Sequence, residues 1–184
     1  MNLTKTKIPG CFEIQHKVRR DHRGKLVKAF SEETFREMGL HKHFPEVYYS
    51  LSDKNVLRGL HFQVPAEHHI KIVLCLHGGL LDAVVDLRVG SPTFGEHILI
   101  ELNSEKSNML YVPEGCAHGF YTLTKDTIFL NQTSTVYSQE HDMGIHWNSC
   151  GIDWPSKNPI VSDKDKNAID FSSFNSPFRY QEEL

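Results

Sequence analysis

Short runs rich in β-branched and aromatic residues, separated by turn residues, recur along the chain and limit its possible folds more than any other feature. The turns include HGG at 77–79, NSEKSN at 103–108 and PEG at 113–115. Many short strands with regular turn signals are typical of a β-sandwich or β-barrel. We therefore expect an all-β protein with strands in these runs: 25–30, 71–76, 80–88, 97–102, 108–113, 119–124 and 127–137.

Two segments predict short helices instead of strands. Residues 31–40 start with a serine that can cap a helix, carry two glutamates in the first turn and reach Gly39 at the end. A second short helix is expected within residues 162–168. The C-terminal tail spans 170–184, and its segment 172–184 is expected to be loosely ordered, as is common at chain ends. Without an internal repeat or linker, the chain fits one domain over residues 1–184.

Composition excludes several classes of function. The net charge is −3, so no basic surface for nucleic acid is indicated. The four cysteines are widely spaced and form no CxxC pair, which argues against a structural zinc site and a disulfide framework. Cys75 lies in an apolar run and is expected to be a buried thiol. No apolar signal segment or membrane-spanning stretch is present, which favours a soluble cytoplasmic protein that does not contact a membrane.

The stretch NVLRGLHFQVPAEHHIKIV, at 55–73, carries several titratable groups inside a strand-like pattern. Simple alternation places Arg58 on the same face as Val56 and Phe62, and His61 on the opposite face. Arg58 and His61 would then not meet, unless Gly59 bends the strand.

A metal centre is one explanation for so many histidines. Metal-binding barrels usually present a His-x-His pair, but the residue two after the first histidine here is Gln63. The adjacent pair at 68–69 points to opposite faces of any strand, which makes a poor chelate. A metal-dependent enzyme is therefore disfavoured. The candidate ligands are His61, His68, His69, His77 and His118.

Several motifs taken together resemble the dTDP-4-dehydrorhamnose 3,5-epimerase family of nucleotide-sugar epimerases. The resemblance covers about residues 5–168. It implies a cupin-type jelly roll with a few short helices, a homodimer, and no metal or organic cofactor. It also implies an isomerase that acts on a nucleotide-diphospho-4-keto-6-deoxy sugar for cell-surface polysaccharide. The motifs are VLRGLHFQ (56–63), KIV (71–73), VVDLRVGSPTFG (84–95), VPEGCAHGF (112–120), YSQEHDMGIHWN (137–148), IDWP (152–155) and SDKD (162–165).

Epimerisation of a 4-keto sugar needs a base, a donor for the enolate oxygen and a proton source on the opposite face. By resemblance, His61 is the base, since the pKa of histidine is roughly 6.5 and lies near working pH. Asp165 would orient it, and Lys71 would stabilise charge on the C4 oxygen. Taken singly, each has a plain structural alternative: a core histidine, a surface aspartate and a solvated lysine.

The resemblance also implies contacts to the rest of the substrate. Arg58 and Arg23 match residues that bind the diphosphate and nucleotide, for which guanidinium groups are well suited. His118 matches a sugar- or phosphate-side histidine, and Asp82 a carboxylate in the pocket near the base. The alternatives are surface arginines, a histidine held by the barrel and a structural carboxylate. Gln63 completes this predicted binding set.

The sequence departs from the family at the proton donor. Aligned on Tyr137, the first tyrosine of the family segment YKxTxxY is replaced here by Asn131. An amide is a poor acid, so Tyr137 or water would have to deliver the proton. A double epimerase, a single-centre epimerase at C3 or C5, and a non-catalytic nucleotide-sugar-binding cupin all remain open.

Further departures fall on the nucleotide side. The usual Gln and Asn pair in FPEVYYS becomes Glu46 and Tyr48, which we expect to contact substrate together with Asn131. Leu26 and Lys28 replace aromatic and acidic positions, and an aromatic two residues before DHRG becomes arginine. A CDP- or GDP-linked sugar is therefore as open as a dTDP-linked one.

Overall fold

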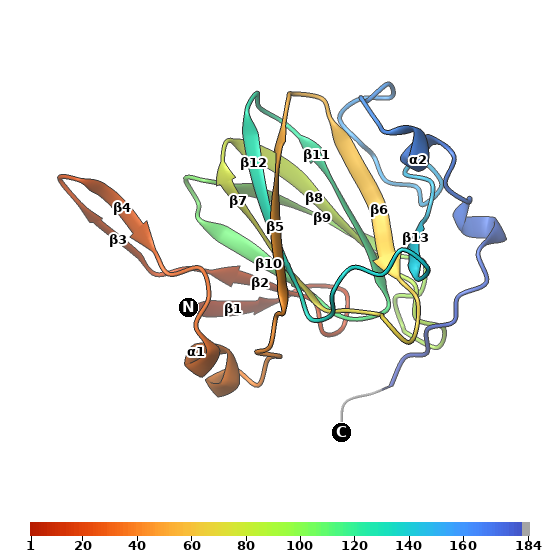
Figure 1. Ribbon diagram of the computed structural model, residues 1–184, viewed down its shortest axis with the longest axis horizontal. Helices are drawn as coiled ribbons and strands as arrows, with labels where there is room; N and C mark the ends of the chain where they lie inside the picture. The colour runs from red at the N-terminus through yellow and green to blue at the C-terminus, as the bar shows by residue number, and fades with distance from the viewer. Residues whose placement is uncertain (182–184) are drawn as a thin grey trace.

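Two antiparallel sheets packed face to face form the body of the protein, as the computed structural model of residues 1–181 shows (Figure 1). The first sheet has six strands: β1 (Asn2–Lys5), β2 (Phe12–Gln15), β10 (Asn108–Val112), β7 (Lys71–His77), β12 (Thr127–Thr133) and β5 (Glu46–Ser52), in that spatial order. The second has five: β13 (Asp142–Gly144), β6 (Leu57–Gln63), β11 (Cys116–Thr122), β8 (Gly79–Asp86) and β9 (His97–Asn103).

The remaining elements are short. A hairpin of β3 (Val18–Asp21) and β4 (Gly24–Val27) projects from the body and contacts the turn after β9, where Lys25 Nζ donates to the Ser104 carbonyl oxygen (Figure 1). Helix α1 (Glu32–Glu37) packs on the six-stranded sheet, and α2 (Asp163–Lys166) lies near β6. A single 3-10 turn, η1, spans Phe171–Ser173. The predicted all-β, cupin-type sandwich with a few short helices is confirmed.

The core follows from the alternation of apolar side chains along the strands. Between the sheets pack residues such as Val73, Val84, Leu110 and Phe129. The outer face of the six-stranded sheet is partly covered by α1 through the buried ring of Phe35. Near one end of the sandwich several inward-facing side chains are polar instead, and there the two sheets enclose a cavity.

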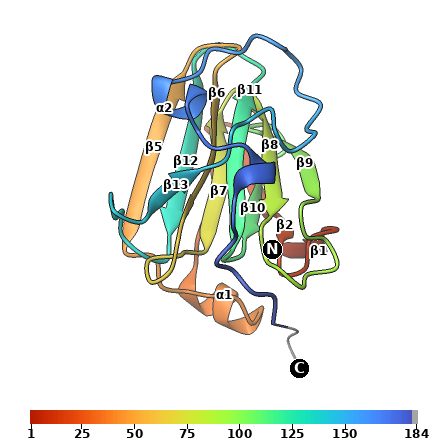
Figure 2. The same ribbon diagram turned by 90° about the vertical axis from the view of Figure 1, so that its right-hand side faces the viewer.

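The C-terminal tail covers the outer face of the five-stranded sheet, so the expectation of loose order over 172–184 is wrong for its described part (Figure 2). Phe178 is 5% exposed and packs on Phe62 with the rings 5.8 Å apart. Val89 exchanges backbone hydrogen bonds with the segment, donating to the Phe178 carbonyl and accepting from Tyr180 N. Aromatic burial outweighs the polar composition of the tail. Residues 182–184 lie outside the described part of the chain.

The predicted helices form, with one difference in capping. Ser31 occupies the N-cap position of α1, but its side chain makes no capping hydrogen bond. At α2, the Ser162 hydroxyl oxygen accepts a hydrogen bond from Asp165 N at 3.1 Å. The second cap matters for function, because it places the Asp165 side chain against β6.

Gly59 changes the direction of the side chains along β6. It has φ +126°, and a Cβ there would lie 2.5 Å from Gly119 Cα of the neighbouring strand. The ladder between β6 and β11 shifts register at this point. Consequently Arg58 and His61 both point toward β5: Arg58 Nε donates to Ser52 Oγ at 3.1 Å, and His61 shares a cavity with β5 side chains. The prediction from simple alternation that these two side chains lie on opposite faces is therefore wrong.

Candidate active site

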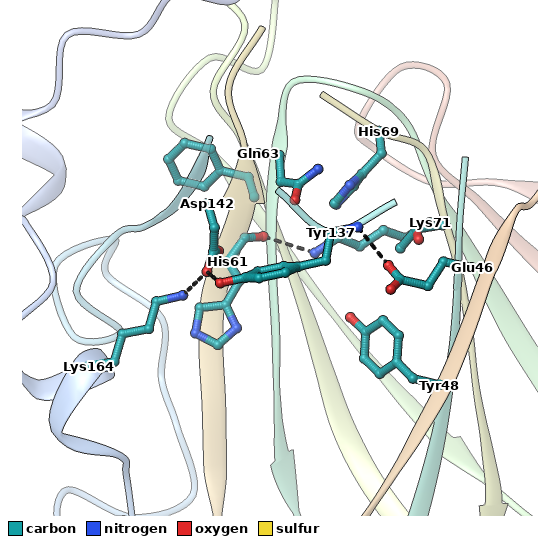
Figure 3. A pocket seen from close by; sticks show the side chains of 11 residues that line it. Glu46, Tyr48, His61, Gln63, His69, Lys71, Tyr137, Asp142 and Lys164 are labelled. Atoms are coloured by element: carbon teal, nitrogen blue, oxygen red, sulfur yellow. Dashed lines mark hydrogen bonds and ion pairs between the residues drawn. The ribbon is translucent and has the colours of Figure 1, made fainter. Parts of the chain in front are cut away.

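A cavity of about 440 Å³ opens between the two sheets near one end of the sandwich (Figure 3). Side chains of β5, β7 and β12 form one wall, and β6 and β13 form the other. Its lining residues are Glu46, Tyr48, His61, Phe62, Gln63, His69, Lys71, Thr133, Tyr137, Asp142 and Lys164. The cavity therefore brings several ionisable side chains together in one place.

His61 is held on its wall by Asp165. His61 Nε2 lies 2.6 Å from Asp165 Oδ1, and Gly59 N donates to the other carboxylate oxygen at 3.3 Å. Burial would raise the pKa of Asp165, but hydrogen bonds from His61 and Gly59 lower it below its ordinary value. A charged carboxylate on Nε2 fixes the tautomer with the proton on that nitrogen. Nδ1, which has no hydrogen-bond partner within residues 1–181, is then the basic atom.

Lys71 lies on the other wall with its side chain extended across the cavity. Only 5% of the residue is exposed, and Nζ donates to the His61 carbonyl oxygen at 3.1 Å. Burial lowers the pKa of Lys71 to about 8, against the opposing charges of Asp142 and Asp82. The ammonium group is thus a cation at neutral pH that loses its proton as the pH rises through about 8.

Tyr137 crosses the mouth of the cavity (Figure 3). Its backbone N donates to Glu46 Oε2 at 2.9 Å, and its hydroxyl donates to Asp142 Oδ2 at 3.2 Å. Asp142 also forms an ion pair with Lys164. Gln63 holds the same segment, because its side chain bonds the Val136 carbonyl and Ser138 N.

A model of the dTDP-4-dehydrorhamnose 3,5-epimerase family matches residues 5–173. The chain belongs to this family. It is therefore an enzyme of the isomerase class, as predicted.

Named relatives of the family match over nearly the whole chain. The dTDP-4-dehydrorhamnose 3,5-epimerase of Shigella flexneri is 40% identical over 174 residues, 93% of this chain and 96% of the relative. A dTDP-4-dehydro-6-deoxyglucose 3-epimerase of a Streptomyces species is 33% identical over 166 residues, 88% of this chain and 84% of the relative. Both double and single epimerases are thus among the relatives.

Solved structures of the family share the fold closely. The dTDP-4-dehydrorhamnose 3,5-epimerase of Elizabethkingia anophelis has a TM-score of 0.88 at 38% identity, covering 94% of this chain and 97% of that one. The dTDP-6-deoxy-D-glucose-3,5-epimerase of Legionella pneumophila, crystallised with dTDP-4-keto-L-rhamnose, has a TM-score of 0.93 at 33% identity. That match covers 98% of this chain and 99% of the other.

In this member of the epimerase family, not every predicted site residue lines the cavity. His118 and Asp82 are buried behind it as a pair, with Nε2 2.9 Å from Asp82 Oδ2, and His118 stacks on Phe129. Burial raises the pKa of Asp82, although His118 opposes the shift. Arg58 is directed at Ser52 of β5 but remains exposed, whereas Arg23 lies on the projecting hairpin, paired with Asp21 and away from the cavity of its own chain.

Five lining residues fall outside the predicted site, and three of them are ionisable: His69, Asp142 and Lys164. His69, which the sequence offers as a candidate metal ligand, borders the cavity, and burial lowers its pKa to about 3. Asp142 and Lys164 stand inside the motifs YSQEHDMGIHWN and SDKD, so a search of those motifs for charged residues would have found them.

Two of the other candidate metal ligands have carboxylate partners instead. His68 pairs with Glu114 at 3.1 Å, and His118 pairs with Asp82. Within residues 1–181, no three histidine, cysteine or carboxylate side chains gather closely enough to share a metal ion. No helix in that range has the length and apolar content needed to cross a membrane.

Proposed function

We propose that this enzyme epimerises a nucleotide-diphospho-4-keto-6-deoxy sugar, with His61 as the base. The observation that carries the proposal is the His61–Asp165 pair facing Lys71 across a cavity, in a chain of this family. The product would enter cell-surface polysaccharide synthesis.

The proposed chemistry begins with proton removal beside the keto group. His61 Nδ1 takes a proton from C3 or C5. The electrons of the broken C–H bond form a double bond to C4, and negative charge develops on the C4 oxygen. Lys71 stabilises this charge, since a buried cation acts strongly where water is excluded. Asp165 stabilises the imidazolium that results, as a positioning residue.

The nucleotide is proposed from the relatives and from the departures in sequence. The relatives named above act on dTDP sugars, so dTDP is the first candidate. Leu26 and Lys28 support CDP or GDP as alternatives, because they alter the expected base-contacting positions. Arg58 is proposed to bind the diphosphate.

A homodimer is proposed because the outer face of β5 is apolar and exposed, and because the hairpin of β3 and β4 projects from the body. Strand β5 points its polar side chains inward and its apolar side chains outward. Glu46 and Tyr48 face the cavity. The outward-facing, exposed side chains are Val47, Tyr49 and Leu51. Such an apolar sheet face is typical of a protein interface. The hairpin that carries Arg23 projects from the body, so a second copy placed on this face could receive it as part of its substrate site.

The function is tested by incubating the enzyme with dTDP-, CDP- and GDP-4-keto-6-deoxyglucose in D₂O. Proton NMR then reports deuterium at C3 and C5 and the configuration of each carbon. Exchange at either carbon of any one sugar supports an epimerase and names its nucleotide. Binding measured by calorimetry, without exchange on any of the three, would indicate the non-catalytic sugar-nucleotide-binding protein instead.

A further inference from the structure

The wall of the cavity opposite His61 holds the phenol of Tyr48, which is expected to contact substrate but has no assigned chemical step. We propose that Tyr48 is the acid that delivers a proton to the sugar carbon on the face opposite His61, an assignment that rests on the proposed epimerase function. The predicted alternative sources were Tyr137 and water.

The two side chains project from different sheets. His61 comes from β6 of the five-stranded sheet, and Tyr48 comes from β5 of the six-stranded sheet, with the cavity between them (Figure 3). Inversion of a carbon requires that the proton leave from one face and return to the other. A sugar ring bound between these walls would present one face to each group.

The register of the six-stranded sheet explains why a phenol fits at position 48. Val73 pairs with Asn131, and Asn131 pairs with Tyr48, so the last two stand side by side in one inward-facing row. Residues paired in this way are about 5 Å apart, which a tyrosine side chain can span. Asn131 Nδ2 donates to the Tyr48 hydroxyl oxygen at 2.6 Å. The amide therefore holds the phenol in place.

The Tyr48 hydroxyl has its hydrogen free to donate to the sugar carbon. Its one hydrogen-bond partner in the described part of the chain is Asn131, which uses the oxygen and leaves the O–H hydrogen available. Burial raises the pKa of Tyr48; the bond from Asn131 offsets part of that shift, and the charges of Glu46 and Asp142 add to it. The phenol is therefore protonated at neutral pH, and after transfer the same Asn131 bond stabilises the phenolate.

Other groups in the cavity are less suited to this step. The Tyr137 hydroxyl donates to Asp142, whose strand β13 pairs with β6. The Tyr137 hydroxyl therefore lies on the same wall of the cavity as His61. His69 is a neutral imidazole near pH 7, because burial lowers its pKa to about 3, and a neutral imidazole is a poor acid. Lys71 Nζ is directed at the His61 carbonyl oxygen, where it suits the enolate oxygen better than the far face of the ring.

The proton balance of the step is simple. The C–H bond breaks, His61 Nδ1 gains the proton, and the electron pair is held as an enolate. The enolate carbon then forms a new C–H bond with the Tyr48 proton, and the O–H electron pair stays on the phenolate. Solvent returns one proton to Tyr48 and removes one from His61, so both groups are reset.

The test is to compare Tyr48→Phe with the natural enzyme in D₂O on the sugar that the natural enzyme accepts. Exchange should continue within a few-fold, because His61 still removes and returns a proton on its own face. Inversion should fall by about 10²–10⁴-fold, the usual contribution of a positioned acid. Tyr180→Phe, which removes a hydroxyl from a ring packed on Arg88, should change neither rate.

A second pair of variants uses the register. Tyr48→Asn should lose inversion. Adding Asn131→Tyr should restore much of it, because the phenol then stands on β12 and the amide on β5, at the same pair of facing positions. Calorimetric affinity for dTDP, CDP or GDP shows that each variant is folded.

Inversion by Tyr48→Phe at the natural rate would overturn the assignment, as would equal loss of exchange and inversion with nucleotide affinity intact. If the natural enzyme exchanges at no carbon, the proposed function fails and the assignment fails with it.

Discussion

His61 Nε2 and Asp165 Oδ1 lie 2.6 Å apart although 104 positions separate them in the sequence. The contact joins β6 of the five-stranded sheet to the short helix α2, and Asp165 is 3% exposed. A buried carboxylate on one ring nitrogen leaves the other nitrogen as the base.

Asp165→Asn is expected to reduce kcat for deuterium exchange by about 10²–10⁴-fold, because the neutral amide no longer stabilises the imidazolium. KM should change little, since Asp165 does not line the cavity. Asp163→Asn is the matched control on the same helix, where the aspartate side chain is 94% exposed. A large loss in the control, or none in Asp165→Asn, would contradict the positioning role.

Lys71 predicts the alkaline limb of the pH profile. Its folded-state pKa of about 8 lies below the ordinary value of 10.5, so the charge is present below pH 8 and is lost as pH rises through that value. We expect kcat/KM to fall above pH 8 as Lys71 loses its charge. Lys71→Met should lower kcat/KM by about 10²–10³-fold and remove this limb. An unchanged limb in the variant would assign it to another group.

Gly59 predicts a specific loss of stability. Gly59→Ala would force a Cβ to within 2.5 Å of Gly119 Cα, whereas Gly24, at φ +123°, has no atom within 4 Å of its added Cβ. Both changes carry the same backbone strain. Gly59→Ala should therefore cost about 1–3 kcal/mol more free energy of unfolding than Gly24→Ala. Urea denaturation measures the difference, and equal costs would show that β6 and β11 are not in close contact.

The homodimer predicts a mass near twice 21.1 kDa by light scattering at micromolar concentration. Leu51→Lys should shift it toward the monomer, because it places a charge on the proposed interface. Ile160→Lys is the control, since Ile160 and Leu51 are both 59% exposed but Ile160 lies off β5. A mass near 21 kDa for the natural enzyme would refute the dimer.

The sequence predicts strands and family well because hydrophobic runs and turn residues are local signals. It does not predict β5, whose polar residues line a cavity and whose apolar residues are exposed, so alternation alone cannot tell which face is buried. It also predicts the wrong face for the Arg58 side chain relative to His61, because the effect of Gly59 depends on the close approach of β11. The pairing of Tyr48 with Asn131 requires the register of two strands far apart in sequence.

The central claim is that His61 removes the proton, and deuterium exchange by His61→Asn tests it most directly. The natural enzyme and the variant are compared in D₂O on the same 4-keto sugar nucleotide, with circular dichroism to confirm the fold. We predict that exchange at every carbon is abolished in the variant while the fold and nucleotide affinity are kept. Exchange at the natural rate would show that His61 is a structural histidine and that another group is the base.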